Sequence, residues 1–149
     1  MLQIAVFTVV AQFPAQQQRL AQYNLEKNEP AIQGYDPVSY FANGRPMKGR
    51  KEYAYSFQGI LYRFSSQRNL NTFNKDPSKY EPQYGGWCAY AMGNDGSKVD
   101  VNPETFKIID GRLYLFYNAF FNNTLKTWNR DQAALKKKAD LNWHKYYHP

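Results

Sequence analysis

Two stretches of the chain alternate between large apolar and polar side chains around a turn signal. Residues 53–57 and 61–64 flank Gln58-Gly59, and residues 106–109 and 113–117 flank Asp110-Gly111. An alternation of period two is typical of a strand with one buried face, and a glycine-containing pair between two such strands favours a tight turn. The pattern therefore predicts two β-hairpins.

Helix signals precede and follow the first predicted hairpin. Asp36, followed by a proline, is placed to cap a helix that ends at Gly44. Ser65 or Ser66 caps a second helix, which runs to about Lys75 and ends before an Asp-Pro pair. Both helices are short and lie next to strands.

The C-terminal part of the sequence is predicted to be helical. Asn118 caps a segment through Trp128, Met92 to Gly96 forms a turn-rich loop, and Asp131 starts a longer helix. That helix carries one apolar stripe, formed by Leu135, Ala139, Trp143, Tyr146 and Tyr147. No internal repeat is apparent. The expected fold is α+β, with a small antiparallel sheet built from hairpins and packed with several short helices and a C-terminal helix.

The first thirty residues differ in character from the rest. Residues 2–11 form an apolar run that is too short to span a bilayer, which needs about 20 residues. It resembles the apolar part of a secretory signal, although no Lys or Arg precedes it; a short buried strand is the alternative. Residues 16–28 read as a polar linker or a short exposed helix. We predict an exported, periplasmic protein with a signal-like start and linker over 1–30 and a single domain over 31–149.

Composition limits the chemistry of the chain. Its 149 residues can bury a core without metal or disulfide staples, and 17% of them are aromatic. Cys88 is the only cysteine, which excludes a disulfide framework and a four-cysteine metal site. The net charge of +7 is spread along the chain, with small clusters at residues 45–51 and 136–138. These are short and lack interleaved aromatic residues, so they indicate a solvated basic surface rather than nucleic-acid binding.

The segment over residues 82–91 is the most distinctive. Two adjacent glycines stand between aromatic residues, which indicates positive φ or a close backbone approach. The small residues Cys88, Ala89 and Ala91 follow and indicate tight packing.

With these residues placed, the chain resembles the YHS-domain family in its stand-alone bacterial type, over about residues 31–147. The motifs that carry the resemblance are Gly34-Tyr35-Asp36-Pro37-Val38, Gly59 with Tyr62-x-Phe64-x-Ser66, Phe73 with Asp76-Pro77-Ser78-Lys79-Tyr80, the 82–91 segment, Ile109-Asp110-Gly111-Arg112-Leu113-Tyr114-Leu115 and Ala139-Asp140-Leu141-Asn142-Trp143. The resemblance implies a small α+β module. Related domains occur in copper-transport ATPases and multicomponent monooxygenases, where cysteine-bearing versions are linked to metal.

The chain departs from that metal-linked pattern. Ser39, Ser65 and Asn69 stand where those relatives carry cysteines, and the histidine of the family name falls near Arg63. Serine and asparagine oxygens are poor ligands for soft metals, and arginine does not coordinate. We therefore expect the thiolate site to be absent.

The leading hypothesis is a non-enzymatic binding module with an aromatic cleft around residues 82–91, which takes a small ligand, a metal ion or a partner protein. Its candidate ligand-binding residues are Asp36, Tyr84, Trp87 and Cys88.

Two alternatives stay open. Cys88, Met92 and His144 are candidate ligands of a copper ion, because Cu(I) prefers thiolate and thioether sulfur. Cys88 is also the candidate nucleophile of a thiol-dependent enzyme or redox sensor. Asp140, His144 and His148 recur every four residues on the last helix, where a solvated polar face is the simpler interpretation.

Overall fold

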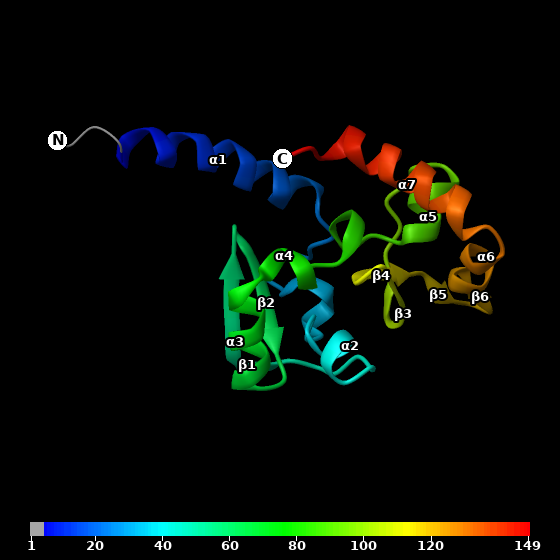
Figure 1. The fold of residues 1–149 in the computed structure, drawn as a ribbon, viewed down its shortest axis with the longest axis horizontal. Helices are drawn as coiled ribbons and strands as arrows, with labels where there is room; N and C mark the ends of the chain where they lie inside the picture. Colours follow the sequence, from blue (N-terminus) through cyan, green and yellow to red (C-terminus); the bar gives the residue numbers. More distant parts are fainter. Residues whose placement is uncertain (1–4) are drawn as a thin grey trace.

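The computed structural model describes the backbone of residues 5–149 and the side chains of residues 14–149 (Figure 1). Its elements, in which η marks a 3₁₀ turn, are α1 (Ala5–Gln22), η1 (Ala31–Gly34), α2 (Ser39–Ala42), β1 (Arg50–Phe57), β2 (Ile60–Phe64), α3 (Gln67–Lys75), α4 (Pro77–Tyr80), η2 (Gln83–Gly86), α5 (Ala89–Asn94), β3 (Asn102–Ile109), β4 (Arg112–Phe116), β5 (Asn118–Ala119), β6 (Asn122–Asn123), α6 (Thr124–Arg130) and α7 (Gln132–Tyr146). Among these residues, no helix combines the length and the apolarity that crossing a membrane requires.

The predicted α+β class is confirmed, as are both predicted hairpins. β1 pairs with β2, β3 with β4 and β5 with β6, each pair antiparallel and forming its own two-stranded sheet. The turns of the two long hairpins place Gln58 and Asp110 at φ of 47° and 50°, each followed by a glycine at positive φ. This is the backbone that a two-residue hairpin turn requires.

Two turns of the same unusual geometry, η1 and η2, open two halves of the fold. Each follows a proline, and each holds two residues and then a glycine at positive φ. Ile32 and Gln33 have φ of 56° and 51°, and Tyr84 and Gly85 have φ of 57° and 60°. An extended aromatic residue then leads into the short helix α2 or α5.

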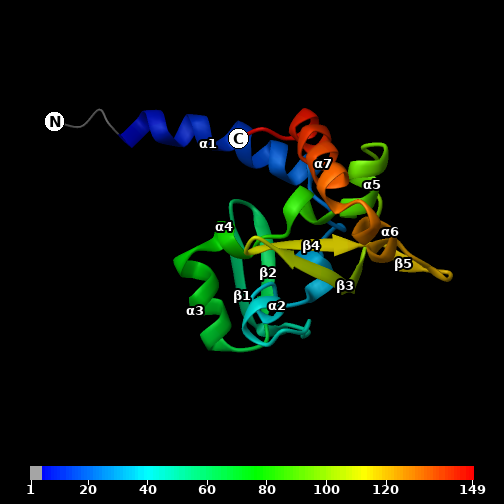
Figure 2. The same cartoon turned by 45° about the vertical axis from the view of Figure 1, so that its right-hand side comes forward.

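The hairpins repeat in the same way. In β1–β2 the register runs from Ala54 opposite Arg63 to Phe57 opposite Ile60, after a shift that follows Arg50. In β3–β4 the same pairs form, and the same shift occurs, at residue numbers that are each larger by 52. Residues 29–66 and 81–118 therefore have the same fold, without a gap. Figure 2 shows the two hairpins crossing, with α3 beside β1–β2 and α6 beside the end of β3–β4.

The absence of an internal repeat, expected from the sequence, is thus wrong. Only nine of the 38 paired positions carry the same residue: Glu29/Glu81, Pro30/Pro82, Gly34/Gly86, Gly44/Gly96, Glu52/Glu104, Gly59/Gly111, Leu61/Leu113, Tyr62/Tyr114 and Phe64/Phe116. These pairs are scattered, and most serve the backbone turns and the buried face of the second strand of each hairpin. The repeat is therefore far plainer in the backbone than in the side chains.

The two halves differ after their hairpins. The N-cap of α3, Ser66, lies two positions after Phe64, whereas the N-cap of α6, Asn123, lies seven positions after Phe116. The additional residues form the small β5–β6 hairpin. The predicted helix capped by Asn118 is therefore wrong in its start, because Asn118 pairs with Asn123 across this hairpin.

The described residues bury two aromatic cores, and both halves contribute to the first. Phe73 is fully buried in the first, and its ring is surrounded by those of Tyr55, Phe57, Tyr62, Phe64 and Tyr80, with centroids 4.9–6.4 Å away. The second core surrounds Trp128, and α7 covers it with the predicted apolar stripe: Ala139 is fully buried, and Leu135, Trp143 and Tyr146 pack beside it. Large flat side chains thus fill both cores.

The segment after Cys88 is helical, where a turn-rich loop was expected. α5 packs against α7, and a Cβ on Gly93 would lie only 2.5 Å from the carbonyl oxygen of Leu135. Gly93 is therefore present because the two helices approach closely, not because the chain turns there. This packing against a distant helix holds α5 in place.

The N-terminal segment is packed onto the domain. α1 continues to Gln22, whose carbonyl accepts the indole N–H of Trp87 at 2.7 Å. The backbone N–H of Asn24 donates to Gly85 at 2.9 Å, and its side chain donates to Gly86 at 3.2 Å. Of residues 16–28, predicted as a polar linker or a short exposed helix, residues 16–22 are thus the end of α1. Residues 23–28 form a strap that is anchored to the domain. Residues 5–11 are helical, so the strand alternative is wrong for them; residues 2–4 lie outside the described part.

Candidate functional site

Asp36 is a buried carboxylate that accepts hydrogen bonds at both oxygens. It begins the turn into α2, where Oδ1 accepts the backbone N–H groups of Val38 and Ser39 at 2.8 and 3.3 Å. Oδ2 accepts the N–H and the hydroxyl of Ser65 at 2.8 and 2.7 Å, and the amide of Asn69 at 2.7 Å. Asp36 thus caps the turn that leads into α2, although α2 itself begins at Ser39 with Val38 at its N-cap, later than predicted. The same carboxylate also fastens the start of α3 to α2.

The three positions that the family resemblance aligns with cysteines therefore meet around one carboxylate. The Ser39 hydroxyl donates to the Asp36 carbonyl at 2.6 Å and accepts the Met47 N–H at 3.0 Å. The Ser65 hydroxyl and the Asn69 amide are engaged by Asp36, whose oxygens already hold five donors. Hydroxyl and amide groups in this arrangement do not suit a soft metal ion. The residues present do not fit the metal-linked version of the site.

Cys88 occupies the position in the second half that Asp36 occupies in the first. The backbone N–H of Asp36 donates to Met47 at 2.8 Å, and that of Cys88 donates to Val99 at 2.9 Å, 52 residues further on. Its Sγ accepts the N–H of Tyr117 at 3.3 Å, as Asp36 accepts the N–H of Ser65.

The surroundings of Cys88 contain no base that would activate it. The thiol is fully buried, and its other polar neighbour is the Thr124 hydroxyl at 3.5 Å. Neither a backbone amide nor a threonine hydroxyl serves as the general base that a nucleophilic thiol needs. The geometry gives Cys88 a packing role in the structure.

The candidate copper ligands do not form one site. Cys88 packs in the first core and Met92 in the second, both fully buried, while His144 lies exposed on α7. The His144 ring stacks with that of His148, with centroids 5.2 Å apart. Within the described part of the chain, no three His, Cys, Asp or Glu side chains converge as metal ligands would.

The aromatic candidates of the 82–91 segment have structural partners. The Tyr84 hydroxyl donates to Asp140 at 2.8 Å, and Asp140 also holds Lys136 at 3.0 Å. Burial, followed by the hydrogen bond to Asp140, raises the pKa of Tyr84 well above its ordinary value. Trp87 donates to the end of α1. These side chains join α7 and α1 to η2, and Tyr84 also lines a hollow of about 340 Å³ with Tyr23, Phe57, Trp143 and Tyr147.

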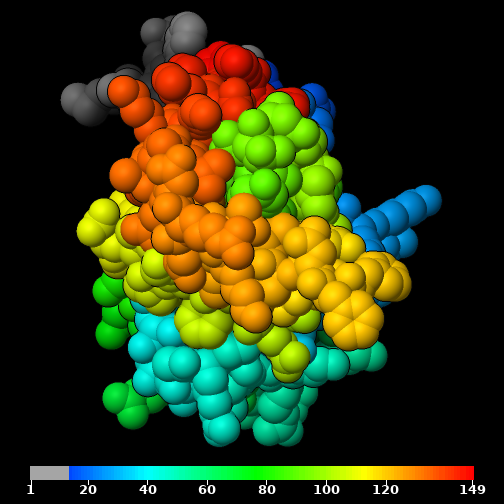
Figure 3. Space-filling model, turned by 90° about the vertical axis from the view of Figure 1, so that its right-hand side faces the viewer, coloured from blue at the N-terminus to red at the C-terminus, as the bar shows by residue number. Residues whose placement is uncertain are grey.

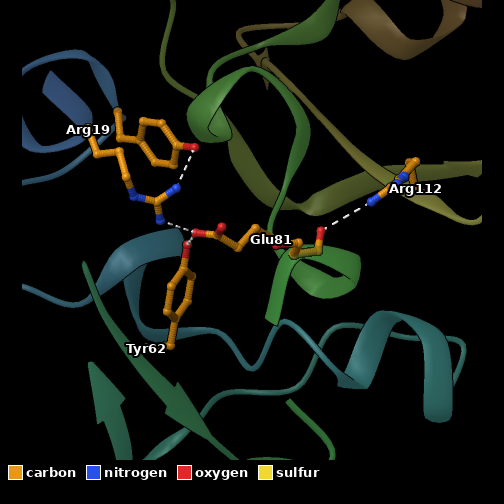
Figure 4. A network of polar contacts seen from close by, with 6 residues as sticks. Arg19, Tyr62, Glu81 and Arg112 are labelled. Atoms are coloured by element: carbon orange, nitrogen blue, oxygen red, sulfur yellow. Dashed lines mark hydrogen bonds and ion pairs between the residues drawn. The ribbon is translucent and has the colours of Figure 1, made fainter. Parts of the chain in front are cut away.

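A buried ionic network lies beside the same turn (Figure 4). Arg19, 4% exposed, donates to Glu81 at 2.6 Å and to the Tyr23 hydroxyl at 2.9 Å, and the Tyr62 hydroxyl donates to the same Glu81 oxygen at 2.5 Å. Burial and the neighbouring Glu81 raise the pKa of Tyr62. Burial alone would lower the pKa of Arg19. The hydrogen bond and the negative charge of Glu81 outweigh this effect, so the pKa of Arg19 is raised. The network ties α1 and β2 to Glu81, which lies between α4 and η2.

A cavity of about 290 Å³ lies between the two turns and the N-terminal strap. Three carboxylates, Glu26, Glu29 and Asp100, contribute to its lining, and none of its lining residues is Lys or Arg. The remaining lining is mostly apolar or aromatic: Tyr23, Asn24, Leu25, Pro30, Ala31, Ile32, Gln33, Tyr62, Pro82, Gly85, Gly86 and Val101. A wider hollow of about 660 Å³ lies over Ser65 and Asn69, but it is shallower and more open to solvent.

Hydrogen bonds fix the mouth of the cavity. Asp100 accepts the side-chain amide of Asn24 at 2.9 Å and the N–H of Val101 at 2.8 Å. The Gln33 amide donates to the carbonyl of Val101 at 3.1 Å. These residues were missed by the sequence interpretation because they lie in segments expected to be linker or loop; only the Gly85-Gly86 pair indicated this place.

Comparison with known protein families gives a match to one part of the chain. Residues 38–84 match the model of the YHS domain, which runs from α2 into η2. No curated protein matches the chain, and no solved structure matches it. The match ends before Cys88 and before the hairpin of the second half.

Proposed function

The chain carries a YHS domain over residues 38–84, and we propose that it acts as a non-enzymatic binding module for a small organic cation. The observation that carries the proposal is the acidic lining of the cavity between η1 and η2. Three carboxylates line that cavity in a chain whose net charge is +7. A cleft lined by charges of one sign attracts ligands of the opposite charge, so this lining favours a cation.

The walls of the cavity suit a ligand with a charged end and an apolar body. Glu26, Glu29 and Asp100 are exposed at its mouth, whereas Ile32 and Tyr62 are buried at its wall. Ligand sites commonly combine such an apolar lining with a few placed polar groups. At about 290 Å³ the space accommodates a small amine or guanidine rather than a large cofactor.

Residues of fixed turns and of the hydrogen-bonded strap form part of the cavity. Both left-handed turns contribute to it, and hydrogen bonds from Asn24 hold the strap to Gly85 and Gly86. Such a site loses little conformational freedom when a ligand binds. The binding module is therefore built where the two halves and the strap meet.

The test is calorimetric titration of the full chain with agmatine, which carries a guanidinium and an amine. We expect saturable binding, weakened about tenfold by Glu29→Gln or Asp100→Asn, which is about 1.4 kcal/mol. The matched control is Glu52→Gln, which removes the same charge from an exposed residue paired with Arg50 outside the cavity. Binding of the dicarboxylate glutarate instead of agmatine, or equal losses in all three variants, would refute the proposal.

We also propose that the protein is exported, as the apolar run of residues 2–11 suggests. A cut between Ala11 and Arg19 would leave the ionic anchor of the strap intact. In the native host we therefore expect a mature N-terminus beyond Ala11, in the periplasmic fraction, by mass spectrometry. An intact Met1 on the native protein would contradict export by a cleaved signal. The division of the chain at residue 30 stays a prediction.

A further inference from the structure

The β5–β6 hairpin exposes two adjacent aromatic side chains at its tip. Phe120 and Phe121 form its two-residue turn and are 91% and 111% exposed, the second more than in a reference peptide. Figure 3 shows this gold segment near residue 120 projecting from the face of the molecule. Large apolar side chains rarely stand in water in this way without a function.

The backbone of this turn makes the two side chains more unusual. Phe120 and Phe121 have φ of 51° and 63°, in the left-handed region that bulky residues avoid. Turns of this kind favour Asn-Gly or Asp-Gly, and the β3–β4 hairpin has Asp110-Gly111 at its turn. Folding therefore explains neither the residue type nor the exposure at positions 120 and 121.

The hairpin is a firm projection on a fixed base. Thr124 donates its backbone N–H and its hydroxyl to the carbonyl of Tyr117, at 3.0 and 2.6 Å. Asn118 donates to the Thr105 hydroxyl at 3.0 Å. The first half has no counterpart of this hairpin, so it is an addition to the repeated fold.

An exposed lysine follows that base directly. Lys126 is exposed on the first turn of α6, directly after the hairpin. The tip thus projects from a surface that holds positive charge near it, in a chain of net charge +7.

We propose that Phe120 and Phe121 form a wedge that inserts into the surface of an anionic lipid bilayer, with Lys126 and the net positive charge of the chain toward the headgroups. Apolar side chains and cationic neighbours together provide the two signals that stable surface binding needs. The two rings bury about 300–500 Å² at most. A stable protein interface needs about 800 Å² on each partner, and among residues 14–149 the other exposed large apolar residues, Leu20, Leu61 and Leu141, lie on other elements.

The test is co-sedimentation of the full chain with vesicles of about 70% phosphatidylcholine and about 30% phosphatidylglycerol, which present an anionic surface. We expect binding that weakens with added salt or with pure phosphatidylcholine vesicles. The double variant Phe120→Asn with Phe121→Gly should lose at least about tenfold in affinity, since it removes both rings. The matched control, Leu141→Gln, removes an exposed apolar side chain from α7 and should bind as wild type.

Thermal unfolding separates lost binding from lost structure. The double variant supplies the residue pair that the turn prefers, so its melting temperature should equal or exceed that of wild type. Absence of wild-type vesicle binding, or equal binding by the double variant, would overturn the proposal. A concentration-dependent dimer that the same variant abolishes would overturn it too, because it would assign the tip to a second copy of the chain.

Discussion

Replacing Asp36 with alanine is expected to lower the free energy of unfolding by about 3–5 kcal/mol. The substitution leaves the donors that Asp36 now holds, from Val38, Ser39, Ser65 and Asn69, without their acceptor, and all of these residues except Ser65 are buried. Each buried donor without a partner costs about 1–3 kcal/mol, unless water enters. Urea unfolding followed by tryptophan fluorescence measures the change.

The repeat supplies a matched control for this prediction. Cys88 stands at the equivalent position but accepts only the Tyr117 N–H, with a weak acceptor atom. We therefore expect Cys88→Ala to cost about 1–2 kcal/mol, mostly from lost packing. Asp36→Asn should remain nearly as harmful as alanine, because its amide turns a donor toward other donors. An Asp36→Ala cost below about 1 kcal/mol, or a larger cost for Cys88→Ala, would contradict this interpretation.

Breaking the Arg19–Glu81 ion pair is the second large effect. We expect Arg19→Met and Glu81→Gln each to destabilise the protein by about 3–5 kcal/mol, because each leaves the other group buried without its partner. The two side chains are only 5% and 10% exposed, so water cannot easily replace the missing group. Arg19 also stacks on the rings of Tyr23 and Phe57, at 4.6 and 5.4 Å, and loses that contact as well.

The double variant distinguishes this mechanism from two independent losses. Arg19→Met with Glu81→Gln removes both charges, so we expect a cost close to that of one single variant and well below the sum of the two. A matched surface pair is Arg50–Glu52, whose side chains are 62% and 53% exposed; its single substitutions should cost less than about 1 kcal/mol. Costs that simply add at Arg19 and Glu81 would show that the two charges are not coupled.

The residues that line the proposed site differ from the candidates that the sequence suggested. Asp36, Tyr84, Trp87 and Cys88 stand out in the sequence because they lie in distinctive motifs, yet each holds the fold together. The carboxylates that line the cavity come from segments without a pattern. Motif residues in this chain specify the architecture, and the proposed site lies where separate segments meet.

The sequence alone determined what depends on near neighbours. The alternation around Gln58-Gly59 and Asp110-Gly111 predicted both long hairpins, since a strand pattern and a turn pair act within a few residues. Ser66 predicted the start of α3, and the four-residue spacing from Leu135 predicted the buried face of α7. These signals are local, so no tertiary contact was needed to interpret them.

The tertiary structure alone decided what depends on residues far apart in the chain. Gly93 suggests a turn in the sequence, but in the structure α7 packs closely against it. Arg19 lies in a segment whose sequence suggests a polar linker or an exposed helix, but its side chain pairs with Glu81, 62 positions away. The left-handed geometry of Ile32 and Tyr84 opposes their local preference, and it exists because the surrounding halves hold it. Long-range packing outweighs local propensity at these positions, which is why the repeat, the cavity and the ionic network could be found only in three dimensions.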